Sequence, residues 1–246
     1  MKAIIVTGFG INADQELAEA FRRAGASPEC VHAADLVAQP ARLASASFLG
    51  FPGGFSFGDH LGSGQLLARL FKTRMEAELK AFVADGGLII GICNGFQTLV
   101  KTGLLPNLSA DGEPEAALIH NKGGSFVDDW VPVRFEPASR CVWTAGLEPR
   151  LLPIRHGEGR FVTRDAAALS RIENEGLVAL RYDGLDPNGS ANGIAGICDP
   201  TGRVLGLMPH PEAFIHPEAH PWRRRGSVGG TGLDIFRQAV AWKSKR

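Results

Sequence analysis

The sequence predicts an α/β fold with a doubly wound, mostly parallel central sheet, helices on both of its faces and a small antiparallel extension. Over residues 1–103, short β-favouring apolar runs alternate with segments of helical apolar spacing. That order produces parallel strands joined by right-handed crossovers. After residue 103, short runs follow one another without clear helical segments between most of them, which is typical of antiparallel strands. The chain has 246 residues and is 44% hydrophobic, so we expect one domain over residues 1–246.

The parallel part takes its elements from the first half of the chain. Apolar runs that favour strands lie at residues 2–7, 30–32, 48–51 and 88–90. Helical apolar faces lie at residues 14–24, 64–84 and 96–100. Because parallel strands share the edge at which they end, we expect the active site in the segments that follow them.

In the second half the pattern is looser. Short strands are predicted at residues 130–135, 141–143, 177–182, 194–198 and 204–208. The third and fourth of these form a hairpin around the turn residues 186–190. A terminal helix is expected at 231–242. Residues 111–114 read as an exposed loop, and residues 155–161 as a polar segment broken by glycines.

Cys93 stands in Gly91-Ile92-Cys93-Asn94-Gly95, between the strand at 88–90 and the helix at 96–100. This order of strand, sharp turn and helix matches a nucleophile elbow, which exposes a reactive side chain at the end of a strand. The amino end of the helix directs unpaired N–H groups and a positive dipole end at the sulfur, so it favours the reactive thiolate. The alternative is a buried cysteine that acts only as a small hydrophobe.

A glycine pair, Gly53 and Gly54, follows the strand at 48–51 and should lie at the same sheet edge as Cys93. Two adjacent glycines can present N–H groups to a developing oxyanion, because no Cβ blocks the approach. A tight turn with no part in catalysis is the alternative.

A cysteine nucleophile needs a base, and the base usually needs an orienting group. Among the seven histidines, His210 is best placed because it follows the strand at 204–208. Pro211 favours an extended conformation at His210, so the side chains of His210 and Glu212 should point to the same side. Glu212 can then accept from one imidazole nitrogen while the other faces Cys93, which predicts a Cys-His-Glu triad.

Two further His–Glu pairs compete with this one. His216 and Glu218 repeat the same tripeptide, but no strand precedes them, so we expect a loop there. His156 and Glu158 lie among glycines, which fits a mobile polar loop near the pocket better than a rigidly held base. We assign that pair a supporting role at most.

Composition excludes several classes of partner. Lys plus Arg and Asp plus Glu number 26 each, so no net charge favours nucleic acid or an anionic membrane. No apolar run approaches the roughly 20 residues of a transmembrane helix, and the first ten residues begin a strand instead of a signal peptide. The four cysteines lack C-x-x-C spacing. We therefore expect free thiols in a reducing cytoplasm, a small substrate and no metal.

Five segments together resemble the class I glutamine amidotransferases, and among them the glutaminase subunits of phosphoribosylformylglycinamidine synthase. These segments are PGGFSFGD at 52–59, GICNGFQ at 91–97, HGEG at 156–159, PNGS at 187–190 and MPHPE at 208–212. The resemblance runs from the first strand to about residue 212. It implies a flavodoxin-like sheet, in agreement with the order of elements above.

The resemblance implies that Cys93 attacks the side-chain amide of glutamine, releases ammonia and leaves a γ-glutamyl thioester that water hydrolyses to glutamate. His210 would activate the thiol, protonate the departing ammonia and later activate water, with Glu212 orienting it. The backbone N–H groups of Gly54 and Asn94 would form the oxyanion hole. The substrate would be held by Gly53, Phe55, Gln97, Asn121 and Phe126.

The resemblance also implies partners: a large synthetase subunit that uses the ammonia to make formylglycinamidine ribonucleotide in purine biosynthesis, and often a small third subunit. This chain has no G-x-x-x-x-G-K-[ST] phosphate loop. We expect no cofactor in it, and ATP and Mg²⁺ in the synthetase subunit. The basic segment 220–226 either docks on an acidic partner surface or is a solvated loop.

Two other functions fit the same site. A self-contained hydrolase or peptidase would keep the Cys-His-Glu site but would lack the exposed apolar surface that a partner needs. An inactive structural member of the synthase complex would need no triad, and the intact Cys93, His210 and Glu212 argue against it.

Overall fold

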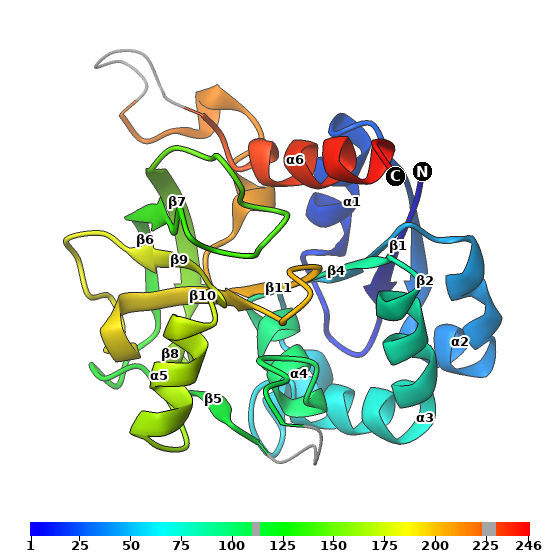
Figure 1. The fold of residues 1–246 in the computed structure, drawn as a ribbon, viewed down its shortest axis with the longest axis horizontal. Coiled ribbons are helices and arrows are strands. Elements are labelled where there is room, and N and C mark those ends of the chain that lie inside the picture. The colour runs from blue at the N-terminus through cyan, green and yellow to red at the C-terminus, as the bar shows by residue number, and fades with distance from the viewer. Residues whose placement is uncertain (110–113, 223–229) are drawn as a thin grey trace.

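The computed structural model describes residues 1–109, 114–222 and 230–246. Through these residues runs a nine-stranded sheet with helices on both of its faces (Figure 1). The strand order is β2-β1-β3-β4-β11-β10-β9-β6-β7. The predicted α/β fold, with a parallel core and an antiparallel part, is confirmed.

Neighbouring strands form the parallel part of the sheet. They are β2 (Ser27–His32), β1 (Lys2–Thr7), β3 (Phe48–Phe51), β4 (Leu88–Ile92) and β11 (Val204–Leu207). β3 and β4 are buried at every residue, which explains why their sequences are continuous apolar runs. Parallel pairing of β3 with β4 and of β4 with β11 brings the carboxyl ends of all three to one edge of the sheet.

The antiparallel part is larger than the small extension predicted. It contains β10 (Ile194–Cys198), β9 (Val178–Tyr182), β6 (Val127–Phe135) and β7 (Arg150–His156). β9 and β10 pair with each other as the predicted hairpin. A separate two-stranded ribbon joins β5 (Ala116–Ile119) to β8 (Arg160–Thr163).

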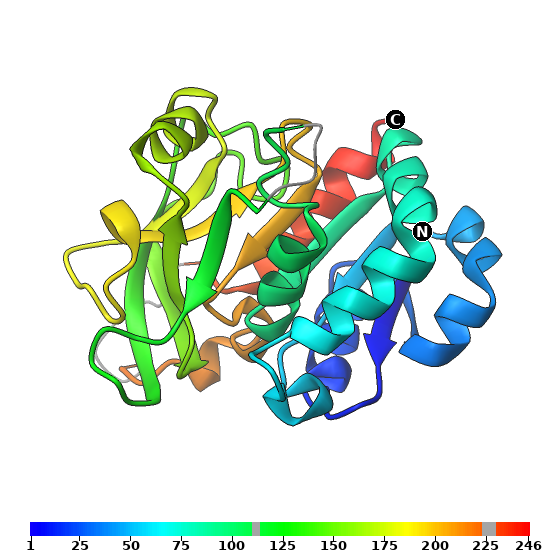
Figure 2. The same cartoon turned by 90° about the horizontal axis from the view of Figure 1, so that it is seen from below.

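Helices cover the parallel strands from both sides (Figures 1 and 2). On one face α1 (Asp14–Arg23) contacts the terminal helix α6 (Leu233–Ser244), and on the other α3 (Gln65–Ala84) packs against α4 (Asn94–Thr102). The shorter helices α2 (Ala33–Ala38) and α5 (Ala166–Asn174) contact α3 and β8, respectively. Among the described residues, no helix is both long and apolar enough to cross a membrane.

The predicted elements of the parallel half are confirmed, with small differences in their bounds. β1 and β3 have the predicted bounds, and β2 begins three residues earlier, at Ser27. The predicted loop at 111–114 lies mostly outside the described residues, as do residues 223–226 of the basic segment.

Residues 141–143 form a buried turn, so the strand predicted there is wrong. Trp143 is fully buried and packs edge-on against Phe21 of α1 and Phe48 of β3. Its indole N–H donates to the carbonyl of Arg203 at 3.0 Å. A buried turn here gives the same alternation of apolar residues as a strand.

β7 is absent from the prediction because Pro153 interrupts its apolar run. β7 is the edge strand of the sheet, where proline's missing N–H is tolerated. β7 ends at His156 and β8 begins at Arg160, so residues 155–156 and 160–161 of the predicted polar segment belong to strands. This difference fixes the positions of Arg155 and His156 at the active-site edge.

Candidate active site

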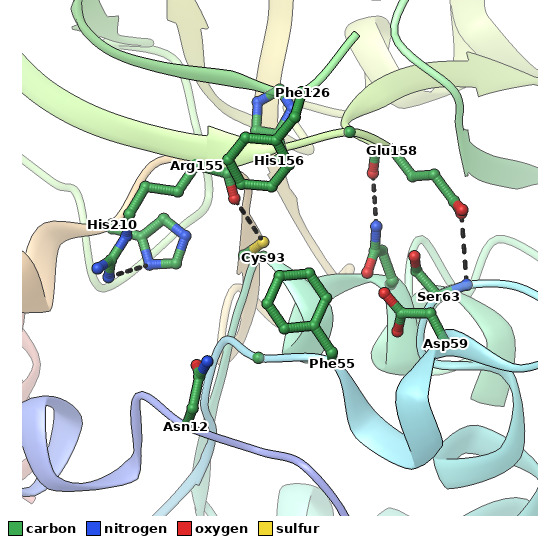
Figure 3. A pocket seen from close by; sticks show the side chains of 13 residues that line it. Asn12, Phe55, Asp59, Ser63, Cys93, Phe126, Arg155, His156, Glu158 and His210 are labelled. Carbon is green, nitrogen blue, oxygen red and sulfur yellow. Dashed lines mark hydrogen bonds between the residues drawn. The ribbon is translucent and has the colours of Figure 1, made fainter. Parts of the chain in front are cut away.

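Three segments meet at the carboxyl edge of the parallel strands. Cys93 follows β4, the pair Gly53 and Gly54 follows β3, and His210 lies three residues beyond the end of β11. Cys93, Gly54 and His210 line one cavity of about 140 Å³, together with Arg155 and His156 from the end of β7 (Figure 3). The predicted position of the site at this edge is therefore where the structure has a cavity.

The backbone of Cys93 is strained. Its φ is 52° and its ψ −106°, a conformation that costs a residue with a side chain on the order of 1–3 kcal/mol. Close packing around the turn imposes it: a Cβ on Gly95 would lie 1.9 Å from the carbonyl oxygen of Phe51. A Cβ on Gly91 would likewise lie 2.6 Å from the carbonyl oxygen of Gly95. Both glycines are thus required for β4 and α4 to close around the elbow.

The thiol of Cys93 faces the cavity. Its Sγ lies 3.6 Å from the carbonyl oxygen of Arg155 and contacts no other cysteine. Asn94 begins α4 directly after it, so the positive end of the helix dipole lies next to the sulfur. These surroundings favour the nucleophile over the alternative of a buried hydrophobe.

His210 and Glu212 form a buried pair. The imidazole Nδ1 donates to Glu212 Oε1 at 2.6 Å, and the side chains are 4% and 0% exposed. The ring nitrogen Nε2 has no hydrogen-bond partner among the described residues and points toward Cys93 (Figure 3). Burial alone would lower the pKa of His210, but the Glu212 carboxylate and the nearby Cys93 outweigh it and raise this pKa to about 10. The imidazole can therefore hold the proton that it takes from the thiol.

The competing His–Glu pairs do not form triads. His216 and Glu218 are exposed on a single 3₁₀ turn, in agreement with the predicted loop. His156 bonds through Nδ1 to Asn121 Oδ1 at 3.0 Å, whereas the Glu158 carboxylate accepts from the N–H of Ser63 at 3.3 Å. Burial, together with the charge of His210, lowers the pKa of His156 to about 4. The prediction of a mobile loop at His156 is wrong, since this residue is the buried end of β7.

The predicted oxyanion donors come from two segments: Gly54 lines the cavity after β3, and Asn94 follows Cys93 at the start of α4. The N–H groups of Gly54 and Asn94 donate to no backbone carbonyl among the described residues. Gly54 has a φ of 147°, and a Cβ there would lie 2.8 Å from the backbone of Asn12. A Cβ on Gly53 would lie 2.8 Å from the His210 ring. This wall of the cavity is bare backbone because no side chain fits.

The end of the cavity remote from His210 is acidic. Asp59 and Glu158 line it on the far side of Cys93 (Figure 3). Burial and the neighbouring Glu158 charge raise the pKa of Asp59. The ammonium of Lys101 lies nearby and donates to the carbonyl of Ser63 at 2.8 Å. Two carboxylates beside one cation leave this end negative, which suits a ligand ammonium group.

Of the five residues predicted to hold the substrate, three line the cavity and two, Gly53 and Asn121, do not. Phe55, Gln97 and Phe126 line the cavity, with the two phenylalanine rings on opposite sides of the sulfur (Figure 3). Asn121 does not line it, and both polar atoms of its side-chain amide are used inside the protein: Nδ2 donates to the carbonyls of Ser125 and His156, and Oδ1 accepts from the N–H of Gly159. The geometry therefore gives Asn121 an indirect task, that of holding the segments that carry Phe126 and His156.

The sequence did not predict that Asp59 and Arg155 line the cavity. It also treated His156 and Glu158 as one pair, although they have different partners in the structure. A signal existed for two of them, since Asp59 ends the motif at 52–59 and Glu158 lies inside the motif at 156–159. Arg155 had none, because it enters the cavity only when β7 forms. Within the described residues, no three His, Cys, Asp or Glu side chains are grouped so as to hold a metal ion.

A cysteine on a strained elbow, a buried His–Glu pair beyond the neighbouring parallel strand and a mixed α/β sheet define a class of enzyme, the class I glutamine amidotransferases. The family model of the CobB/CobQ-like glutamine amidotransferase domain matches residues 1–243. The chain belongs to this family.

Proteins of known assignment agree with that family. The chain is 40% identical over 250 residues to the phosphoribosylformylglycinamidine synthase subunit PurQ of Dehalococcoides mccartyi, covering 98% of this chain and 97% of that protein. It is 41% identical over 267 residues to the PurQ subunit of Methanococcus maripaludis, with 99% of both covered. A chain in the structure of PurLQS from Thermotoga maritima matches with a TM-score of 0.77 and 31% identity, over 98% of each chain.

Proposed function

We propose that this chain is the glutaminase subunit of a phosphoribosylformylglycinamidine synthase. It hydrolyses glutamine to glutamate and ammonia, and the ammonia is used by a synthetase subunit that makes formylglycinamidine ribonucleotide in purine biosynthesis. The observation that carries this proposal is the buried His210–Glu212 pair facing the strained Cys93, in a chain that spans nearly the whole length of its PurQ relatives.

Cys93, His210 and Glu212 perform the chemistry. His210 Nε2 takes the thiol proton, and the thiolate attacks the side-chain amide carbon of glutamine. The imidazolium then gives its proton to the leaving nitrogen, so that ammonia departs and a γ-glutamyl thioester remains. His210 next takes a proton from water, which attacks the thioester, releases glutamate and restores the thiol. Glu212 holds Nδ1 in its protonated form throughout, so that Nε2 is free to exchange the proton.

Each tetrahedral intermediate carries its negative charge on the former amide oxygen. The unpaired N–H groups of Gly54 and Asn94 stabilise this oxyanion, a contribution of about 3–4 kcal/mol for each donor. The amino-acid end of glutamine lies at the acidic end of the cavity, where Asp59 and Glu158 attract the α-ammonium. Phe55, Gln97 and Phe126 complete this binding site, with Gly53 and Asn121 positioning its walls.

Exposed apolar residues at the mouth of the cavity favour a subunit of a complex over a self-contained hydrolase. Phe9, Phe55, Leu61 and Phe126 are 37%, 49%, 83% and 53% exposed, and they lie on the segments that carry the lining residues. Phe9 and Leu61 do not line the cavity and have no task in the reaction above, whereas a partner can cover them. The partner consumes ammonia, and the ATP and Mg²⁺ of the complex belong to that partner.

The cysteines support a cytoplasmic location as part of this proposal. All four are free thiols, and two of them, Cys141 and Cys198, are fully buried without forming a disulfide. A reducing compartment maintains this state. The continuous sheet supports a single domain over residues 1–246.

The test is Cys93→Ala in the assembled complex. We expect glutamine-dependent synthesis to fall to background, while synthesis from added ammonium chloride stays close to wild type. Retention of glutamine-dependent synthesis would remove Cys93 as the nucleophile. Loss of both activities would show that the variant damages the complex, and Cys93→Ser then provides a closer isostere for the same comparison.

A further inference from the structure

We propose that Arg155 is a positioning residue that competes with Glu212 for His210 and thereby limits how much of the reactive imidazolium–thiolate pair forms. Arg155 is not in the triad and has no part in the chemistry described above. The inference rests on the proposed function only in taking Cys93 as the nucleophile and His210 as its base.

The guanidinium of Arg155 reaches the triad from the side away from the sulfur. Its Nη2 lies 3.2 Å from His210 Nδ1 and 3.8 Å from Glu212 Oε1. His210 lies between this guanidinium and Cys93 (Figure 3). The positive charge is therefore closer to the imidazole than to the thiolate.

His210 Nδ1 cannot satisfy both neighbours at once. An ionised Glu212 only accepts, so its 2.6 Å bond requires a proton on Nδ1. Arginine only donates, so its 3.2 Å contact is a hydrogen bond only when Nδ1 has no proton. In the first tautomer Nε2 is free to accept the thiol proton, and in the second it is already protonated. Arg155 thus favours the tautomer that cannot act as a base.

The charges around His210 determine the sign of the effect. Glu212, two residues along from His210, and the Cys93 thiolate after β4 favour imidazolium. The positive charge of Arg155 on β7 repels imidazolium, because its Nη2 lies 3.2 Å from the ring. His156, next to Arg155, is held neutral by burial and by the charge of His210 itself. Removal of the Arg155 charge therefore allows more transfer of the thiol proton to the imidazole.

Glu16 on α1 pulls Arg155 in the other direction. Its Oε2 lies 3.3 Å from the same Nη2, and both side chains are partly exposed, at 46% for Glu16 and 36% for Arg155. The guanidinium is thus shared between an outer carboxylate and the buried triad. Without the Glu16 charge, Arg155 has only Glu212 as an anionic partner among the described residues, and its hold on the triad strengthens.

The experiment measures the rate at which iodoacetamide alkylates Cys93 as a function of pH, in the full-length chain, with peptide mapping to separate Cys93 from the exposed Cys30. We expect Arg155→Gln to raise the rate on the plateau above the first midpoint of the rate–pH curve by up to about tenfold, because stabilising the imidazolium–thiolate pair by one pKa unit is a factor of ten in its population. The midpoint itself should move up, because a positive charge has been lost. Arg155→Lys keeps the positive charge and should stay close to wild type. Glu16→Gln should lower the plateau rate.

Matched controls come from α1. Arg23 and Glu19 form an exposed ion pair at 2.6 Å on the same helix as Glu16, so Arg23→Gln and Glu19→Gln should leave the curve unchanged. The proposal is overturned if Arg155→Gln does not raise the plateau rate, or if Glu16→Gln changes the plateau rate in the same direction as Arg155→Gln. If Arg155→Gln does not fold, the direction in which Glu16→Gln changes the plateau rate decides alone. A wild-type curve that does not depend on His210, tested with His210→Gln, would instead contradict the proposed function.

Discussion

At the scale of single residues, the reactivity of Cys93 depends on where charge is placed around it. His210 keeps a raised pKa of about 10 because Glu212 is buried against it, so the imidazole can be charged at neutral pH. His156, which lines the same cavity, has its pKa lowered to about 4 by burial and by the charge of His210, and stays neutral. One charged and one neutral histidine at the same site follow from the presence or absence of a buried carboxylate partner.

Glu212 and Glu218 provide a direct test of which His-Pro-Glu tripeptide is catalytic. We expect Glu212→Ala to reduce glutaminase activity of the assembled complex by about 10² to 10⁴-fold, because His210 loses the acceptor that fixes its tautomer. Glu218→Ala, at an exposed position on the 3₁₀ turn, should change little. The opposite order of effects would mean that the second tripeptide supplies the base.

His156 should contribute to the acid sensitivity of the fold. Its pKa is 6.5 in the unfolded chain and about 4 in the folded one, so the unfolded state binds the proton more tightly. The stabilisation is present above pH 6.5 and is lost as the pH falls toward 4, by about 3 kcal/mol in total. His156→Gln keeps an N–H donor for Asn121 and should remove this loss. Urea unfolding across that pH range measures it, and equal losses in the two proteins would contradict the assignment.

The triad residues were accessible to sequence reasoning because each lies in a short local motif. Cys93 stands between glycines at a strand-to-helix boundary, and His210 and Glu212 are two residues apart beside prolines. Asp59, Glu158 and Arg155 reach the cavity only through tertiary structure, from a loop and from the end of an edge strand that a proline conceals. Asn121 illustrates the converse, since the resemblance that named it gave no sign that both polar atoms of its side-chain amide would be used inside the protein.

At the scale of elements, the active site depends on how closely α4 approaches the sheet. The helix begins directly after Cys93 and is buried over most of its length, with Gly95 against the carbonyl of Phe51 at the end of β3. β3, β4 and α4 were predicted because each has a strong apolar pattern of its own. The turn at 141–143 was mistaken for a strand, because burial alone produces the same pattern without any partner strand.

Gly95→Ala should break this contact. Its new Cβ would lie 1.9 Å from backbone oxygen, so α4 must move away from the sheet. We expect a loss of about 3 kcal/mol or more in the free energy of unfolding, together with loss of glutaminase activity. Gly123→Ala is the control, since the nearest atom to its Cβ is the Ser125 hydroxyl at 4.0 Å, and it should cost no more than about 0.5 kcal/mol. Equal stabilities by thermal unfolding would contradict the account of the elbow.

At the scale of the whole molecule, the parallel half of the sheet holds the nucleophile and its base, and the antiparallel half brings a wall of the cavity across to them through β7 (Figure 1). Phe55 and Phe126, which line the cavity, are exposed, as are Phe9 and Leu61 on the neighbouring loops. Exposed apolar side chains on the loops that carry the active site are suited to contact with a second subunit.

Leu61 tests this role of the rim. It is 83% exposed, between the lining residues Asp59 and Ser63, and its own side chain does not line the cavity. We expect Leu61→Glu to weaken binding of the synthetase subunit by about tenfold or more, because a charge would be buried at the interface. Leu185→Glu, on the β9–β10 loop and 46% exposed, is the control and should bind normally. Unchanged affinity of the Leu61 variant in a titration would place the interface elsewhere.

The central claim, that Cys93 is a nucleophile directed at glutamine, is tested most directly by mass spectrometry of the chain after exposure to a diazo-ketone analogue of glutamine. We expect one adduct, mapped to Cys93, that excess glutamine suppresses, either in the isolated chain or once the synthetase subunit is present. An adduct on another residue, or no adduct on Cys93 in either state, would contradict the account and favour an inactive scaffold or a hydrolase of different specificity.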